Sequence, residues 1–236
     1  MSESRIFEWI PDEAAHAGPE HLDPEYVETY DLKTGPEPAD DVDLLRSLGL
    51  DQTSTLIDLG AGTGSLALAA APYCRRVIAV DVSPAMVRLL RQKVDQSGLT
   101  NIECVLGGFL SYEHQGPPAD FIVSRHALHH LPDFWKAVAL QRMADVLRPG
   151  GILRLRDLVY SFSASEAEEV FGTWLDCAAP SEQYGWTREE LETHIREEFS
   201  TFSWLLEPML EQAGFTIQAI EHAPTRVFSA YTCVRG

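Results

Sequence analysis

Between residues 54 and 160 the sequence alternates short, continuously apolar runs with stretches of helical periodicity. Strands that are apolar at every position are buried on both faces, which is typical of a parallel sheet covered by helices on both sides. The chain is therefore expected to fold as a doubly wound, Rossmann-like α/β structure. The expected strands are 54–59, 76–81, 101–106, 119–124 and 151–159, and the expected helices between them are 64–73, 83–97 and 133–147.

Residues 161–200 break this alternation and are expected to form a helical cap inserted into the fold. Thr187 and Glu190 have the spacing of a capping box, which predicts that one of the cap helices begins there. A further helix and two strands follow, and the short connection between the strands predicts an antiparallel hairpin at the edge of a mainly parallel, seven-stranded sheet. These last elements are the helix 203–213 and the strands 216–222 and 226–234.

The charge balance limits the partners of this chain. With 18 Lys and Arg residues against 36 Asp and Glu residues, the formal net charge is −18, and such a surface repels a polyanion. We therefore expect no nucleic-acid partner. The first residues lack the basic and apolar blocks of a secretory signal, and no apolar run reaches the ~20 residues that span a bilayer. We expect a cytoplasmic protein with no membrane partner and, because the cysteines form no CxxC pair, no zinc knuckle.

The strongest local motif is LIDLGAGTG at 56–64, where a strand reaches Asp58 and three glycines follow on alternate positions before a helix. Glycines at these positions let the backbone turn sharply and let a ligand lie against bare main chain. A dinucleotide-binding loop would carry its third glycine one residue later, where this chain has Ser65. Asp58 is placed to receive the amine of a ligand, so the loop favours an amino-acid nucleoside over a pyrophosphate.

Asp81 ends the next strand, 21 residues after Gly60. An acidic side chain at this spacing can accept hydrogen bonds from both ribose hydroxyls of a nucleotide-like ligand. The alternative is that Asp81 or Ser83 caps the following helix, in which Pro84 is the first residue. The two interpretations are compatible if Ser83 caps the helix and Asp81 binds the ligand.

In this order, over about residues 40–160, the motifs resemble those of the class I S-adenosylmethionine-dependent methyltransferases of the bacterial small-molecule type. The glycine loop resembles their first motif and Asp81 their ribose-binding acid, while 105–110, 119–133 and 142–157 resemble the regions around their third, fourth and fifth strands. The resemblance implies S-adenosyl-L-methionine as the cofactor. It also implies these cofactor-binding residues: Asp58, Gly60, Ala61, Gly62, Gly64, Asp81, Val82, Met86, Gly107, Gly108, Phe109, Ser124 and Arg125.

Gly108 departs from that family's pattern, in which an acid at this position receives the adenine amino group. Adenine would then be held by backbone groups of residues 107–109 and by apolar packing, for which Met86 is a candidate unless it belongs to the core. We expect either a lowered cofactor affinity or a substitute contact from elsewhere in the chain. If the contact is missing, Gly108→Asp should tighten cofactor binding.

Three residues are candidates for the chemistry. His126 follows the fourth strand and could act as a base or orient the acceptor, although it could also support the cofactor through its backbone or serve the structure only. Asp157 ends the fifth strand and either orients the acceptor or pairs with Arg125 or Arg156. Tyr30 lies in a segment that resembles the lid helix of this family, where it either touches the carboxylate end of the cofactor or packs the lid.

Other polar side chains near the strand ends are interpreted as structural. His129 is a weaker candidate for catalysis than His126, and His130 is expected to brace the loop that carries it. Arg154 and Arg156 alternate on one face of a central strand, where unpaired guanidinium groups would be costly, so we expect them to be paired. No carboxylate cluster follows the fourth strand, and we therefore expect no metal.

The resemblance implies methyl transfer from S-adenosylmethionine to a nitrogen, oxygen or carbon atom of a small-molecule acceptor, by direct in-line displacement. The alternatives are a regulatory module that binds the cofactor without turnover and a methyltransferase that acts on RNA or protein. The glycine spacing argues against a nicotinamide dehydrogenase. The expected organisation is one domain, with lid helices at 1–50, a cofactor-binding half at 51–160, the cap at 161–200, and the last helix and hairpin at 201–236. The sequence indicates neither the acceptor nor an oligomeric state.

Overall fold

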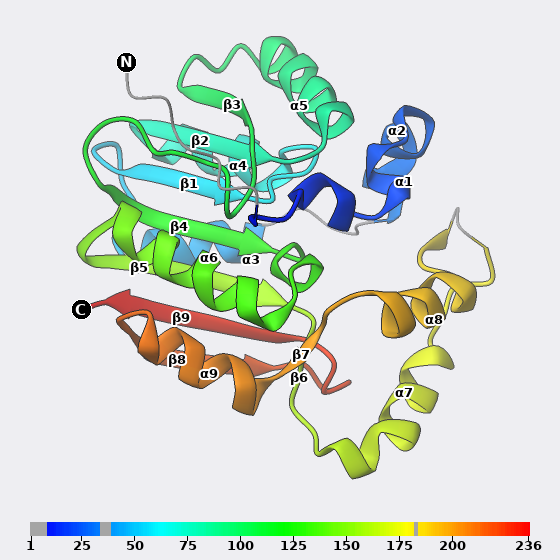
Figure 1. Ribbon diagram of the computed structural model, residues 1–236. Helices are drawn as coiled ribbons and strands as arrows, with labels where there is room; N and C mark the ends of the chain where they lie inside the picture. The colour runs from blue at the N-terminus through cyan, green and yellow to red at the C-terminus, as the bar shows by residue number, and fades with distance from the viewer. Residues whose placement is uncertain (1–8, 34–38, 182–183) are drawn as a thin grey trace.

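The computed structural model describes residues 9–33, 39–181 and 184–236 (Figure 1). Within these ranges a seven-stranded sheet has the strand order β3-β2-β1-β4-β5-β9-β8. Strands β1 to β5 run parallel, and β9 runs antiparallel to both β5 and β8. The predicted doubly wound fold with a C-terminal antiparallel hairpin is confirmed. The strands are β1 Thr55–Leu59, β2 Arg76–Asp81, β3 Ile102–Leu106, β4 Ala119–Arg125, β5 Leu147–Asp157, β8 Phe215–His222 and β9 Ser229–Arg235.

Helices cover both faces of this sheet and divide its core into two apolar layers. One layer lies under α6 and α9, and the other lies under α3, α4 and α5. Strand β1 shows why apolar residues occupy both faces of a strand: Ile57 packs into the first layer and Leu56 into the second, because neighbouring side chains point to opposite faces. These helices are α3 Ala39–Ser47, α4 Ser65–Ala70, α5 Pro84–Ser97, α6 Asp133–Val146 and α9 Ser203–Gln212.

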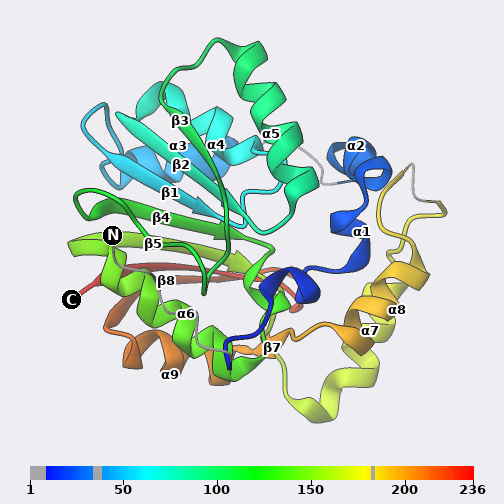
Figure 2. The ribbon, with the colours of Figure 1, turned by 45° about the horizontal axis from the view of Figure 1, so that its top comes forward.

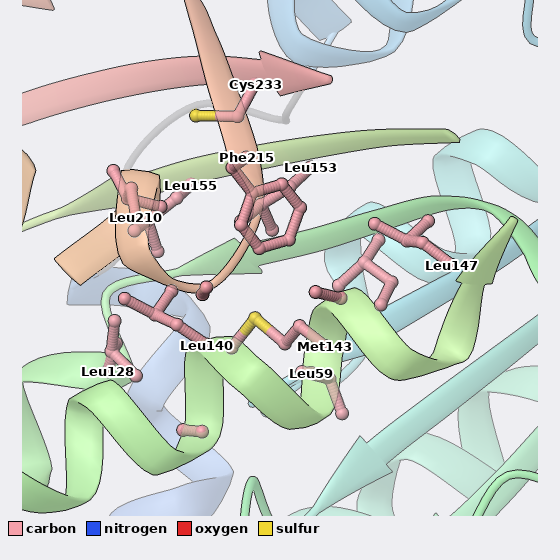
Figure 3. Packing of buried hydrophobic residues seen from close by; sticks show 14 of the residues in the cluster. Leu59, Leu128, Leu140, Met143, Leu147, Leu153, Leu155, Leu210, Phe215 and Cys233 are labelled. Atoms are coloured by element: carbon pink, nitrogen blue, oxygen red, sulfur yellow. The ribbon is translucent and has the colours of Figure 1, made fainter. Parts of the chain in front are cut away.

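The first layer is the larger of the two and supports the central strands. Leu140 and Met143 of α6 pack against β5 leucines such as Leu153 and Leu155 (Figure 3). Leu128 belongs to the same cluster and lies in the segment that directly follows β4. The segment that follows β4 is therefore anchored in the core, which matters because it forms one wall of the site described below.

A lid and a cap lie beyond the carboxyl ends of the parallel strands (Figures 1 and 2). The cap has its own small apolar cluster, which includes Tyr160, Trp174 and Leu191. Lys33 of the lid donates a hydrogen bond to Glu190 of the cap at 2.7 Å, so the two elements are joined across the strand ends. The lid elements are η1 Glu13–His16, α1 Pro19–Leu22 and α2 Pro24–Lys33; the cap elements are β6 Val159–Tyr160, η4 Ala164–Glu166, α7 Ala167–Leu175, α8 Arg188–Glu197 and β7 Thr201–Phe202.

Two of the predicted helix starts are confirmed. Ser83 caps α5 by accepting a hydrogen bond from the backbone N–H of Met86 at 3.1 Å. Thr187 and Glu190 form the reciprocal bonds of a capping box at the start of α8. Residues 1–8 and 34–38 of the expected lid lie outside the described residues. None of the helices that the structure describes has the length and apolar character to cross a bilayer.

Candidate active site

A pocket lies at the carboxyl ends of β1, β2 and β4, beneath the N-terminal helices. This is where ligands bind in open α/β sheets, because the loops that follow the strands diverge there. Most of the predicted site residues line this pocket. They are Tyr30, Gly60, Gly62, Asp81, Val82, Met86, Gly107, Gly108, Phe109, Arg125 and His126. Residues that were not predicted as site residues also line it, namely Glu13, Ala17, His21, Ser83, Ala127, His130 and Leu131.

Five predicted residues do not line the pocket and lie behind its wall: Asp58, Ala61, Gly64, Ser124 and Asp157. Gly64 has a packing role, since a Cβ added to it would lie 2.1 Å from a methyl group of Leu90. The Ser124 side chain is fully buried. Gly64 and Ser124 therefore shape the site without facing the pocket, while the buried carboxylate of Asp58 lies next to the glycine loop.

The glycine loop presents bare backbone to the pocket. Gly60 has φ +75°, and a Cβ there would lie 2.3 Å from the Cβ of Ala127, so this position admits only glycine. Gly62 has φ +54°, but nothing lies within 4 Å of where its Cβ would be. Its backbone N–H donates to Asp81 Oδ2 at 2.7 Å, which ties the loop to the end of β2. The space above Gly62 is thus available to a ligand.

Two buried carboxylates lie under and beside this loop. Burial raises the pKa of Asp81 despite the hydrogen bonds that it accepts from backbone N–H groups of Ser83 and Gly62. Burial also raises the pKa of Asp58 to about 7, although the positive charge of Arg125 acts in the opposite direction. In the described part of the chain, Asp58 Oδ2 has no hydrogen-bond partner. A buried acid of this kind is neutralised either by a proton or by a cationic ligand.

Glu13 occupies the space beside Gly108. Its Oε1 atom accepts a hydrogen bond from the backbone N–H of Leu110 at 2.9 Å, and its Oε2 atom accepts one from Ser111 Oγ at 2.8 Å. A Cβ added to Gly108 would lie 2.5 Å from Glu13 Oε1 and 2.4 Å from a methyl group of Val82. A carboxylate from the N-terminal segment therefore occupies the space that a side chain at position 108 would enter.

His126 has a strained backbone and a neutral ring. Its φ of 51° is rare for a residue with a side chain, and strain of this kind is maintained only where the surroundings impose it. Its backbone N–H donates to the carbonyl of Arg156 at 2.8 Å, and its ring packs edge-on against Phe228. Burial lowers the pKa of the imidazole to about 4. Nδ1 has no hydrogen-bond partner in the part of the chain that is described.

The structure corrects the expected environment of Asp157. Its Oδ1 atom lies 2.5 Å from His129 Nδ1, and its Oδ2 atom accepts a hydrogen bond from the backbone N–H of Leu128 at 2.7 Å. Burial lowers the pKa of His129, but the charge of Asp157 and hydrogen bonds to it outweigh burial and raise the value to about 9. Asp157 thus holds the segment that follows β4, and its carboxylate does not face the pocket.

The expected pairing of Asp157 with an arginine is wrong, because the arginines turn to the other face of the sheet. Asp41 of α3 lies 3.2 Å from Arg125 and 3.7 Å from Arg156. Arg154 is buried and lies 2.8 Å from Glu221, which confirms that the arginines of β5 are paired within the structure.

Tyr30 lies at the lid side of the pocket, where its ring packs edge-on against His21. Burial, together with the nearby acids and Tyr26, raises the pKa of its phenol, which therefore keeps its proton. Asp31 accepts a hydrogen bond from Thr63 of the glycine loop at 2.5 Å, so the lid helix is tied directly to the loop.

A second hollow lies between α6 and the loop that follows β3, lined by residues such as Tyr112, His114 and Arg142. It lies against the face of β1 that carries Ile57 and Leu59, and Phe109 is the single predicted site residue in its lining. Because most of the predicted site residues line the first pocket, we take that pocket as the candidate site.

Comparisons with known proteins agree with this arrangement. Residues 56–151 match the family model described as a methyltransferase domain. The sequence is 30% identical over 164 residues to an uncharacterized methyltransferase of Anoxybacillus flavithermus, a match that covers 70% of each chain. A match at 34% identity to the uncharacterized methyltransferase YcgJ of Bacillus subtilis covers 43% of this chain and only 40% of that protein. A SAM-dependent methyltransferase from Aquifex aeolicus has a similar structure, with a TM-score of 0.64 and 19% identity, over 91% of this chain and 99% of that chain.

The sheet, the site at its strand ends and these relatives together define a methyltransferase. The chain belongs to the class I S-adenosylmethionine-dependent methyltransferases, and S-adenosylmethionine is its cofactor.

Proposed function

We propose that this enzyme methylates a small molecule in the pocket beneath the lid, with the cap closing over the acceptor side. The link between Lys33 and Glu190 carries this proposal, because it joins lid to cap across the strand ends, and the Lys33 side chain is only 2% exposed. An acceptor must fit within that enclosure, which favours a metabolite over a folded protein or an RNA. The net charge of −18 also disfavours RNA. In this proposal residues 161–200 select the acceptor.

The pocket suits the cofactor in charge and in shape. S-adenosylmethionine supplies a methyl group on a cationic sulfur, so the protein needs chiefly to align the reactants and exclude water. We assign Asp81 to the ribose hydroxyls. The cofactor would lie against the backbone of Gly62 beside them, because no atom of the described residues lies within 4 Å of where a Cβ of Gly62 would be. Asp58, a buried carboxylate with an unpartnered oxygen, would neutralise the amino group from beneath the loop.

The proposal assigns adenine recognition to Glu13 in place of an acid at position 108. Its two oxygens are fixed by Leu110 and Ser111, and a carboxylate oxygen can accept a further hydrogen bond. The adenine amino group is a donor of the kind that such an oxygen would receive. Met86 and Phe109 line the same pocket and supply apolar contact.

On the acceptor side the proposal assigns His126 as a base or orienting group. A neutral imidazole can accept a hydrogen bond from an acceptor hydroxyl or amine, and the pKa of about 4 keeps this ring neutral near neutral pH. The same low pKa makes it a weak base, so orienting the acceptor is the role that it fits better. Tyr30 remains protonated and can donate a hydrogen bond. Asp157 contributes only by positioning the segment that follows β4, through its bonds to Leu128 and His129.

We expect His126→Ala to lower turnover by roughly 100-fold if the imidazole accepts the acceptor's proton, with cofactor affinity nearly unchanged. The measurement is transfer of a labelled methyl group over a mixed metabolite pool, with cofactor binding measured by calorimetry. His222→Ala is the matched control, since His222 bonds to Ser229 in the C-terminal hairpin. Near-normal turnover in His126→Ala would remove this residue from the chemistry.

The acceptor class is tested by offering the enzyme labelled S-adenosylmethionine with separate fractions of metabolites, protein and RNA from a cell extract. The proposal predicts label in the metabolite fraction alone. Label that accumulates in RNA or protein, and that requires an intact Asp81, would overturn the small-molecule assignment.

A further inference from the structure

Three potential metal ligands converge where the cap meets the sheet, behind the wall of the cofactor pocket. His129 belongs to η3 (Leu128–His130), His194 belongs to α8, and Glu198 directly follows α8. One ligand atom from each lies within 4.8 Å of the others. The three side chains are 6%, 12% and 21% exposed, so bulk water is largely excluded from the group.

The carboxylate of Glu198 lies between the two imidazoles. Its Oε2 atom lies 3.0 Å from His129 Nε2 and 2.5 Å from His194 Nδ1. One ligand atom from each of the three side chains therefore faces the same small volume, and zinc bonds of ~2.0–2.1 Å would spread these atoms to about 3.3 Å from one another.

The outer nitrogen of each imidazole is held by an oxygen atom. His129 Nδ1 lies 2.5 Å from Asp157 Oδ1, and His194 Nε2 lies 2.9 Å from Ser200 Oγ. Histidines that bind metals almost always have this second contact, because it fixes the ring and leaves the inner nitrogen free to coordinate. Asp157 is itself fixed by the backbone N–H of Leu128 and of Leu158.

We propose that His129 Nε2, His194 Nδ1 and Glu198 bind one divalent transition-metal ion of the zinc type. Two imidazoles and one carboxylate suit zinc, whereas Mg²⁺ and Ca²⁺ require mostly oxygen ligands. Three protein ligands leave a fourth position for water. The inference goes beyond methyl transfer and does not depend on it.

The ion would fasten the cap to the wall of the pocket. His129 lies next to His130, which lines the pocket, and His194 and Glu198 belong to the cap segment. A shared ion would therefore cross-link α8 to the segment that follows β4 and favour the closed cap. The sequence did not indicate this site. A CxxC pair and a carboxylate cluster after the fourth strand are local patterns, whereas these three ligands meet across two distant segments.

The test is calorimetric titration of the metal-free protein with zinc chloride, together with the visible absorption of a cobalt(II) complex. We expect one ion per chain. His194→Ala and Glu198→Gln should weaken zinc binding by at least ~10-fold, the loss typical even of residues that only support a ligand. Glu197→Gln is the matched control, because Glu197 is adjacent, is 64% exposed and contacts Arg196. His222→Ala controls for the loss of a histidine elsewhere.

The absence of saturable zinc binding by the wild-type protein would overturn the proposal and leave the cluster as a chain of ion pairs. Equal zinc affinities for Glu198→Gln and Glu197→Gln would overturn it as well, and so would binding of Mg²⁺ in preference to zinc. The titration of the wild-type protein tests the proposal without any variant, so the test stands even if a variant fails to fold.

Discussion

Gly108→Asp should weaken S-adenosylmethionine binding by at least ~10-fold, although it adds the acid that the family resemblance expects at this position. The new side chain would meet Glu13 Oε1 at 2.5 Å and Val82 at 2.4 Å, and it would place two like charges side by side. Glu13→Gln alone should weaken binding by roughly 10- to 100-fold, because it replaces a charged acceptor of the adenine amino group by an amide. Calorimetric titration with the cofactor measures both effects.

The two changes should compensate in part when they are combined. In a Glu13→Ala background the clash and the charge repulsion with Glu13 are removed and only Val82 still crowds position 108, so Gly108→Asp should recover part of the affinity relative to Glu13→Ala alone. Glu168→Ala, which removes an exposed acid of α7, controls for net charge. Tighter binding by Gly108→Asp in the otherwise wild-type protein would contradict the role of Glu13 and would support the simpler view that the contact is missing.

Asp58→Asn should stabilise the cofactor-free protein at pH 8 and weaken cofactor binding at the same pH. Burial raises the pKa of Asp58 from 3.8 to about 7. An acid whose pKa is raised on folding contributes most to stability below its unfolded pKa, and this contribution is lost as the pH rises through about 7. A residue that cannot ionise avoids this loss, so the variant should gain roughly 1–4 kcal/mol in the free energy of unfolding at pH 8.

Cofactor binding should require the ionised form of Asp58 and should therefore weaken as the pH falls, whereas the stability of the cofactor-free protein should rise. The carboxylate neutralises a cation only when it is ionised, so wild-type affinity should fall by up to ~10-fold per pH unit below about pH 7, and the slope should disappear in Asp58→Asn. Asp81 and Arg125 face the same group, and both are present in the two proteins compared. Denaturant unfolding and calorimetry from pH 5 to 8 measure the two trends. Equal pH slopes for wild type and variant would contradict a role for Asp58 in charge recognition.

The sheet and the glycine loop could be predicted because their signals are local. Every residue of β1 is buried, and the strand is marked by Leu56, Ile57 and Leu59, which put apolar side chains on both of its faces. The left-handed backbone at Gly60 and Gly62 requires glycine in any chain that makes this turn. The distance from Gly60 to Asp81 is set by one helix and one strand, which places the acid at the next strand end.

The remaining parts of the site depend on contacts between distant segments. Glu13 and Leu110 are 97 positions apart, and no local periodicity indicates that they meet. The partner of Asp157 could not be predicted either, because several charged residues lie near it in sequence. Arg125 and Arg156 instead reach Asp41 of α3, and this leaves His129 for Asp157.

Titration of the wild-type protein with S-adenosylmethionine and with its demethylated product tests the central claim most directly. We predict one site per chain with micromolar affinity, lost in Gly62→Arg, whose side chain would fill the space above the loop. Gly98→Arg is the matched control: Gly98 also has a positive φ and no atom within 4 Å of its Cβ position, but it ends α5 away from the pocket. No binding of either ligand at millimolar concentration, or equal binding by the two arginine variants, would contradict the cofactor site.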